Sequence, residues 1–203
     1  MNNLKKTILE QYSKDKKKIQ ARLNEFRTLP ENLYIKEFMF CILTPQSNAQ
    51  RCWEAVAQIQ LLKDKNKTNV AQILKTKTRF HNNKTLYLLE GLSKWDEIKQ
   101  LIKSQNIKEL RNVLAENVKG YGLKESSHFL RNIGKSSNKI AILDRHILKN
   151  LKEFNIISDN KIKSKNNYLE TEEKFLKFSK QIGIPPDELD LLFWSMENGE
   201  IFK

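Results

Sequence analysis

The chain has 203 residues, of which 39% are hydrophobic and 30% charged, a composition typical of globular proteins and not of disordered ones. Lysine and arginine outnumber aspartate and glutamate by 37 to 24, giving a net charge of +13. This excess suits a polyanionic partner, either nucleic acid or an anionic membrane surface, and the alternative is a solvated basic surface without such a partner. No apolar run reaches the ~20 residues of a membrane span, and the N-terminus lacks the apolar core of a secretory signal.

Helical periodicity dominates the chain and strand-like alternation is nearly absent, which predicts an all-α protein. In the first half, Thr44-Pro45 ends one predicted helix, and Ser47-Asn48 resembles the N-cap of the next. The helices expected here cover residues 3–26, 33–43, 50–62, 70–74 (a short one), 82–92 and 95–103.

Two cysteines, Cys41 and Cys52, fall in these apolar helical surroundings. They lie eleven residues apart without a CxxC motif or a nearby histidine, so the sequence excludes a zinc ribbon and a four-cysteine iron–sulfur loop. We expect buried free thiols, a reducing compartment and no metal site.

The second half begins with a predicted helix over 107–117, followed by Gly120 and Gly122. Further helices are expected over 125–133, 146–154, 167–181 and 186–196. Gly134 ends the first of these and Asp144 precedes the second, while residues 140–143 alone look extended and are too few for a sheet.

The stretch 118–144 is the most informative part of the chain. A Gly-x-Gly turn between helices is the helix–hairpin–helix pattern, in which main-chain amides approach a DNA backbone, although Gly-x-Gly by itself is a weak signal. Lys124 follows the turn and is a candidate amine nucleophile, with Asp144 as its charge partner. The simpler alternatives are a surface lysine and an ordinary N-cap aspartate. Arg145 and His146 are either exposed first-turn residues or phosphate contacts.

Five segments together make the chain recognisable. Gly-x-Gly-x-Lys followed some twenty residues later by Leu-Asp-x-His resembles the helix–hairpin–helix DNA glycosylase superfamily, and more closely the archaeal-type 8-oxoguanine DNA glycosylase/AP lyase family. The segments that carry the resemblance are LTPQSNAQRCW (43–53), RFHNNK (79–84), GYGLKESSHFLRNIG (120–134), ILDRHIL (142–148) and LDLLFWSMENGEIFK (189–203). The family's Gly/Pro character is thin here, since 135–139 contains neither residue.

The resemblance implies a bifunctional enzyme of base excision repair. It removes 8-oxoguanine from DNA, and Lys124 forms a Schiff base through which β-elimination cuts the strand, with Asp144 stabilising the positive charge on the sugar. The alternatives are a bifunctional glycosylase for another oxidised base and a non-catalytic helix–hairpin–helix DNA-binding protein.

The resemblance also assigns recognition residues. Phe80, Trp194 and Lys203 would form the 8-oxoguanine pocket, whereas core packing of the two aromatics and fraying of the lysine are the alternatives. Gln46 would fill the gap left by the flipped base, or would be only a polar residue near a helix start. The DNA-binding set is completed by Gly120, Gly122, Arg145 and His146.

The expected fold is that of helix–hairpin–helix DNA glycosylases. One helical subdomain would cover 30–135, and the other 1–29 plus 136–203, with the DNA cleft between them. The expected partner is double-stranded DNA containing 8-oxoguanine, without a membrane partner. We expect a monomer, located in the cytoplasm at the nucleoid, with no cofactor except for room for a monovalent cation at the hairpin.

Overall fold

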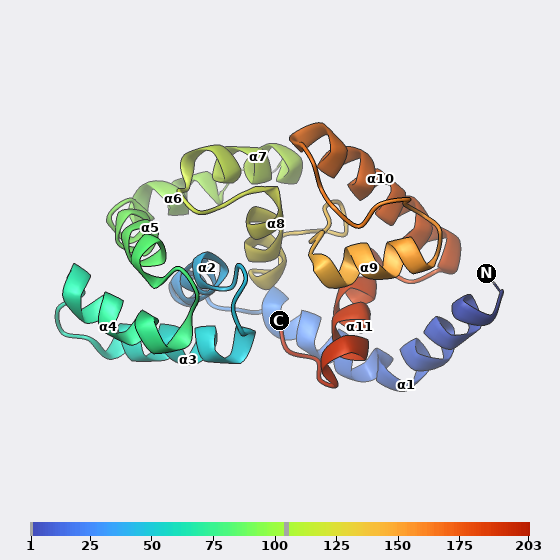
Figure 1. Cartoon of the computed structure of the whole chain (residues 1–203), viewed down its shortest axis with the longest axis horizontal. Helices are drawn as coiled ribbons and strands as arrows, with labels where there is room; N and C mark the ends of the chain where they lie inside the picture. Colours follow the sequence, from blue (N-terminus) through green and yellow to red (C-terminus); the bar gives the residue numbers. More distant parts are fainter. Residues whose placement is uncertain (1, 104–105) are drawn as a thin grey trace. The chain divides into compact units, whose positions relative to one another are not determined.

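The computed structural model describes residues 2–103 and 106–203, and all regular structure within those ranges is helical. The prediction of an all-α protein is therefore confirmed. In chain order (Figure 1) the elements are α1 (Asn2–Arg27), a 3-10 turn (Glu31–Leu33), α2 (Tyr34–Leu43), α3 (Ala49–Leu61), α4 (Lys67–Lys77), α5 (His81–Ser93), α6 (Trp95–Leu101), α7 (Ile107–Asn117), α8 (Leu123–Asn132), α9 (Arg145–Glu153), α10 (Lys165–Ile182) and α11 (Pro186–Asn198).

Two segments differ from the sequence-based expectation. The short helix expected over 70–74 is the longer α4, because the Asn66 side chain accepts the amide of Asn69 and caps a polar first turn that carries no apolar periodicity. The extended residues 140–143 form no sheet, and side chains of α10 satisfy their backbone instead. Glu172 accepts the Ala141 amide at 2.8 Å, and the Tyr168 hydroxyl donates to the Ala141 carbonyl at 2.7 Å.

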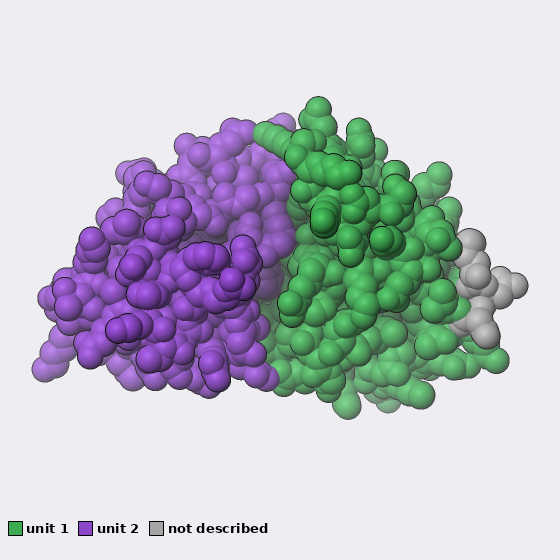
Figure 2. All heavy atoms as spheres, in the orientation of Figure 1, with its two compact units in different colours: residues 1–29, 130–203 green, residues 30–129 purple. Residues whose placement is uncertain are grey.

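The chain divides into two compact units, coloured separately in Figure 2. Unit 1 comprises residues 1–29 and 130–203, and unit 2 comprises residues 30–129. Because α8 contains the boundary, its first residues belong to unit 2 and its last residues to unit 1.

Unit 2 is built around α2, whose residues from Glu37 to Leu43 are all buried. The Phe38 ring lies in its middle, with ring centroids 5.1 to 5.9 Å from those of Trp95, Tyr121 and Phe129. A Cβ on Gly91 of α5 would come within 2.6 Å of the Phe38 ring, so a glycine lets α5 approach this cluster. Helices α3 and α4 extend the packing from α2 and α5.

In unit 1, α11 packs against α1, α9 and α10. Its residues Asp187–Phe193 are buried, and α1 contributes Ile8, Ile19, Leu23 and Phe26 to the same core. Gly134 ends α8 with a φ of +71°, where a Cβ would lie 2.5 Å from the Arg27 Cα, so only glycine fits. In the part of the chain that the structure describes, no helix is long and apolar enough to cross a membrane.

Candidate active site

The Gly-x-Gly turn between α7 and α8 has the expected form. Gly120 has a φ of +89°, and a Cβ there would lie 2.6 Å from the Tyr87 ring, so both the backbone conformation and the space require glycine. Gly122 precedes α8, and its amide donates to the Glu125 carboxylate at 3.1 Å. This is the glutamate half of a capping box, which fixes the start of α8.

Lys124 lies in the first turn of α8 with a side chain that is 28% exposed. Its Nζ is 2.8 Å from Oε1 of Glu125, whose other oxygen accepts the Gly122 amide. Glu125 therefore ties the amine to the hairpin backbone. Sequence reasoning missed Glu125, although the Gly-x-x-Glu spacing that caps a helix was a usable signal.

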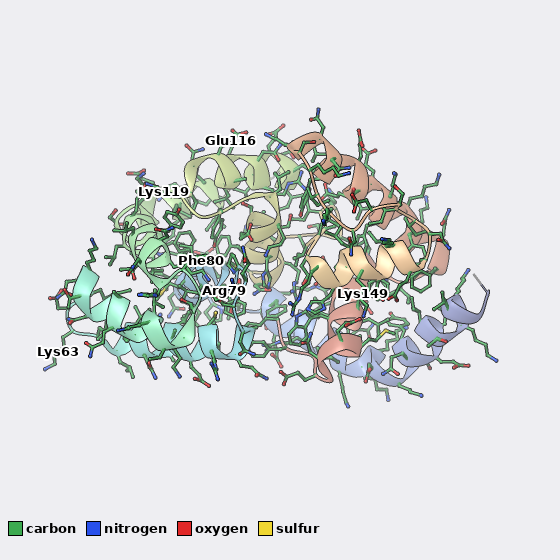
Figure 3. The ribbon with its side chains drawn as sticks, in the orientation of Figure 1. Lys63, Arg79, Phe80, Glu116, Lys119 and Lys149 are labelled. Atoms are coloured by element: carbon green, nitrogen blue, oxygen red, sulfur yellow. The ribbon has the colours of Figure 1, made fainter. Side chains whose placement is uncertain are left out.

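Gln46 and Phe80 share an uncommon backbone conformation within unit 2. Both are left-handed, with φ of +54° and +57°, which non-glycine residues rarely adopt. Phe80 is 53% exposed, and the Arg79 guanidinium lies 5.3 Å from its ring centroid (Figure 3). The alternative that Phe80 packs in the core is therefore wrong, and its ring is accessible to a ligand. Gln46 is also exposed.

Lys84 of α5 joins the segments that carry these two residues. Its ammonium donates to the carbonyls of Leu43 and Pro45 at 2.6 and 2.8 Å and to the Ser47 hydroxyl at 2.8 Å. The Leu43 carbonyl also accepts the Cys52 thiol at 3.2 Å. Burial is the main cause that lowers the pKa of Lys84 to about 8, and the positive charges of Lys124 and Arg79 contribute to that shift. No sequence pattern singled out Lys84.

Asp144 is the N-cap of α9, as expected. Its Oδ1 accepts the amides of His146 and Ile147 at 2.8 and 2.9 Å, which leaves Oδ2 without a bond to this helix end. The cap fixes the carboxylate at the positive end of the helix dipole. The half-buried His146 accepts from Arg145 Nε at 3.2 Å, and Arg145 is exposed.

A group of buried charged residues lies behind Asp144 in unit 1. Arg131 of α8 and Asp190 of α11 form an ion pair at 3.3 Å. Burial raises the pKa of Asp190 to about 7, because desolvation and the charges of Asp144 and Asp187 outweigh the opposing effect of Arg131. Asp187 accepts the Ser136 hydroxyl at 2.6 Å, and burial raises its pKa as well.

The last residues pack onto α1 and α11 within unit 1. Trp194 is half-buried, and its ring lies 6.2 Å from that of Phe202. Lys203 is only 7% exposed, and its Nζ lies 5.7 Å from the Phe26 ring centroid. The alternative that this lysine belongs to a frayed chain end is therefore wrong. Arg22 holds the segment in place, because its Nε donates to the Phe202 carbonyl at 2.5 Å. Sequence reasoning missed Arg22.

In unit 2, Lys84 thus bonds to the segments that carry Gln46 and Phe80, and it is near enough to Lys124 for that charge to affect its pKa. In unit 1, Asp144 is near enough to the Arg131–Asp190 pair to raise the pKa of Asp190, and Trp194 of α11 lies beside the last segment, which ends in Lys203. Within residues 2–103 and 106–203, no three His, Cys, Asp or Glu side chains are grouped to hold a metal ion. Cys41 and Cys52 are both buried free thiols, as predicted.

Comparison with known proteins gives this geometry a family. The model of the family described as Ogg-HhH, 8-oxoguanine DNA glycosylase, matches residues 19–184. A relative named 8-oxoguanine DNA glycosylase/AP lyase from Fusobacterium nucleatum is 39% identical over 91% of this chain and 90% of its own, and one of the same name from Thermoplasma volcanium is 34% identical over 91% of each.

Solved structures agree with the sequence comparison. The Methanocaldococcus jannaschii 8-oxoguanine glycosylase/lyase, in complex with a 15mer DNA containing 8-oxoguanine, has a TM-score of 0.89 at 30% identity, with all of both chains covered. The 8-oxoguanine DNA glycosylase of Thermotoga maritima has a TM-score of 0.88 at 29% identity, again over both whole chains. With a family model spanning most of its length and these similarities in sequence and fold, the chain belongs to the helix–hairpin–helix 8-oxoguanine DNA glycosylase family.

Proposed function

We propose that this protein excises 8-oxoguanine from double-stranded DNA and then cuts the strand 3′ to the abasic site. The observation that carries the proposal is Lys124, an accessible amine at the start of α8, directly behind the Gly-x-Gly turn and tied to it through Glu125. The identity of the excised base, 8-oxoguanine, is inferred from the family to which the chain belongs. The protein acts as a monomer on chromosomal DNA in the cytoplasm.

The reaction needs the damaged base outside the helix. A base stacked in a duplex is inaccessible, so it flips out at a cost of a few kcal/mol, and Gln46 fills the gap. The exposed Phe80 ring offers a stacking face, worth about 1–3 kcal/mol for a purine. Trp194 and Lys203 provide an aromatic surface and a charged hydrogen-bond donor for the lesion edge.

Lys124 then attacks the sugar. After its ammonium gives a proton to the Glu125 carboxylate 2.8 Å away, the amine nitrogen bonds to C1′ while the C1′–N9 bond breaks. The base leaves with the electron pair of that bond and takes up the proton held by Glu125. Ring opening gives a Schiff base between Nζ and C1′. Loss of a C2′ proton and breakage of the C3′–O bond release the 3′ phosphate and nick the strand.

Asp144 supports the positive charge that develops on the sugar as the base departs. Its Oδ1 is committed to two helix amides, and Oδ2 is the oxygen assigned to the sugar. Backbone amides around Gly120 and Gly122, with the Arg145 and His146 side chains, bind the phosphates. The Gly122 amide already donates to Glu125, so a phosphate or a monovalent cation at the hairpin uses the neighbouring backbone groups.

Borohydride trapping tests the proposal, because it reduces the Schiff base to a stable covalent link. The wild-type protein should cross-link to duplex DNA containing 8-oxoguanine, and Lys124→Gln should give no adduct. Lys119→Gln is the matched control: it removes an exposed lysine of the same hairpin, whose ammonium lies 3.7 Å from Glu90 and 5.9 Å from the Tyr87 ring centroid, and it should still trap.

The outcomes separate the competing functions. Trapping on oxidised pyrimidines with none on 8-oxoguanine would assign another lesion. Binding to DNA with no adduct and no excision would indicate a non-catalytic DNA-binding protein. Normal trapping and cleavage by Lys124→Gln would overturn the mechanism.

A further inference from the structure

Lys84 carries a buried positive charge and takes no part in the steps of the proposed reaction. It is 4% exposed, and all three N–H groups of its ammonium have an acceptor: the Leu43 and Pro45 carbonyls and the Ser47 hydroxyl. Burying a cation is unfavourable unless each donor is satisfied. A methionine or leucine would fill the same space in a helical core without that cost. Packing alone therefore does not explain why a charged residue occupies this position.

The acceptors of Lys84 all belong to the segment that carries Gln46. We name residues 43–48, between α2 and α3, the Gln46 loop. The loop reverses direction through a turn in which the Ser47 amide donates to the Thr44 carbonyl at 3.0 Å, and Gln46 is left-handed within it. A left-handed non-glycine residue costs on the order of 1–3 kcal/mol and persists only where its surroundings fix it.

The second segment is the Phe80 turn, residues 78–80, which connects α4 to α5. Ser47 joins it to the Gln46 loop, because its hydroxyl oxygen accepts both the Lys84 ammonium at 2.8 Å and the Arg79 amide at 3.0 Å. The Lys84 amide in turn donates to the Phe80 carbonyl at 3.0 Å. One residue therefore binds the Phe80 turn with its backbone and the Gln46 loop with its side chain.

We infer that Lys84 is a positioning residue for lesion recognition, which holds the Gln46 loop and the Phe80 turn in one fixed arrangement. The inference rests on the proposed function, in which Gln46 fills the gap in the duplex while Phe80 stacks on the base that left it. Both contacts exist only in the flipped state, so their spacing must be set before DNA binds. A misplacement of about 1 Å in such a constellation costs on the order of 100-fold in rate.

The test compares two substrates for the variant Lys84→Met, which keeps the length of the side chain and removes its donors. On duplex DNA containing 8-oxoguanine, single-turnover excision should fall by about 100-fold. On duplex DNA with a preformed abasic site, borohydride trapping should stay close to wild type, because no base has to be flipped or stacked and Lys124 is untouched. A 2-aminopurine next to the lesion should lose the fluorescence rise that wild-type protein causes.

Ser47→Ala keeps two acceptors of Lys84 but removes the bridge to the Arg79 amide, and it should shift the same ratio of the two rates by a smaller factor. Val70→Ala is the control for stability, since it removes buried volume from α4 at a residue outside both segments. Lys63→Met is the control for charge, because Lys63 is exposed and lies at the left edge of unit 2, away from Arg79 and Phe80 (Figure 3). Both controls should leave the ratio unchanged.

Parallel loss of both activities by Lys84→Met, at the folded fraction where Val70→Ala remains active, would show a structural role only and overturn the inference. Unchanged excision by both Lys84→Met and Ser47→Ala would overturn it too. Failure of the proposed function is distinguishable, because the wild-type protein would then neither excise 8-oxoguanine nor trap.

Discussion

Each unit contains a segment that we propose for lesion recognition, and in each a basic side chain donates to the backbone carbonyls of that segment, but the two arrangements differ. In unit 2, Lys84 is 4% exposed and gives three hydrogen bonds to the Gln46 loop. In unit 1, the Arg22 side chain is 23% exposed, and it gives one bond to the Phe202 carbonyl beside an ion pair with Glu25.

The difference concerns how much each segment can move. Every donor of the buried Lys84 ammonium has its acceptor in the Gln46 loop, so moving the loop would leave a buried charge without hydrogen bonds. The single bond of Arg22 is reached by solvent, and water can replace it at little cost. We therefore expect the Gln46 loop and the Phe80 turn to be rigid, and the segment ending in Lys203 to adjust when the lesion binds.

The largest effect is expected from removing the Lys203 ammonium, the charged group at the end of the segment that we expect to adjust. Lys203→Met should lower excision of 8-oxoguanine by about 10- to 100-fold, the value of one charge-assisted hydrogen bond, while strand cleavage at preformed abasic sites is retained. The rate of 8-oxoguanine excision and the rate of strand cleavage at abasic sites measure this. Equal losses on both would place Lys203 outside the base pocket.

A smaller effect should follow from loosening the segment without changing Lys203. Arg22→Met removes the bond to the Phe202 carbonyl and should reduce the preference for 8-oxoguanine over guanine by about 2- to 10-fold, the range for one net hydrogen bond. Glu25→Gln is the control, since it weakens only the exposed ion pair with Arg22. If the two variants behave alike, the contact with the Phe202 carbonyl does not order the segment.

The buried charges of the two units should give opposite responses of stability to pH. The pKa of Asp190 is raised to about 7, and it interacts with Arg131, Asp144 and Asp187. Because the native state then binds more protons than the unfolded chain, the contribution of Asp190 to the free energy of unfolding falls as pH rises from 4 to 7.

Lys84 acts in the other direction, with a pKa lowered to about 8 among Cys52, Arg79, Lys124 and Glu125. Above pH 8 the unfolded chain binds more protons, so its contribution to the free energy of unfolding rises toward pH 10.5. Urea denaturation at a series of pH values measures both: Asp190→Asn should flatten only the acidic slope, and Lys84→Met only the alkaline one. If the slope of unfolding free energy against pH stays the same in the corresponding variant, another group is responsible for that titration.

The smallest effect concerns phosphate binding by the two units. Neutralising about six phosphates predicts a slope near −5 for log binding constant against log salt concentration. Arg145→Gln in unit 1 should reduce the magnitude of that slope by about one, and Gln substitution of the exposed Lys63 should not change it. A salt-independent affinity would contradict a basic DNA-binding surface.

Local signals in the sequence predicted most of the helices and part of the site. Helix α7 was expected over 107–117, where the structure has it, and Asp144 caps α9 as its spacing indicated. Gly134 and Pro186 mark the end of α8 and the start of α11 because glycine and proline act on their own backbone.

The supports of the site were not predictable in this way. The acceptors of Lys84 lie 37 to 41 residues away from it, and the Arg22 acceptor lies 180 residues away. Neither distance leaves a periodic pattern, so only the folded chain identifies the two residues. The left-handed backbone of Gln46 and Phe80 is likewise imposed by tertiary contacts and not by residue type.

The thiol of Cys52 illustrates what this packing means for a protein that acts on oxidised DNA. Cys52 is fully buried next to Lys84, it donates to the Leu43 carbonyl, and burial raises its pKa to about 11. Peroxides attack the thiolate, which this site almost never contains. The oxidants that produce 8-oxoguanine would therefore leave the anchor of the Gln46 loop chemically intact, so recognition persists under the conditions in which the lesion is made.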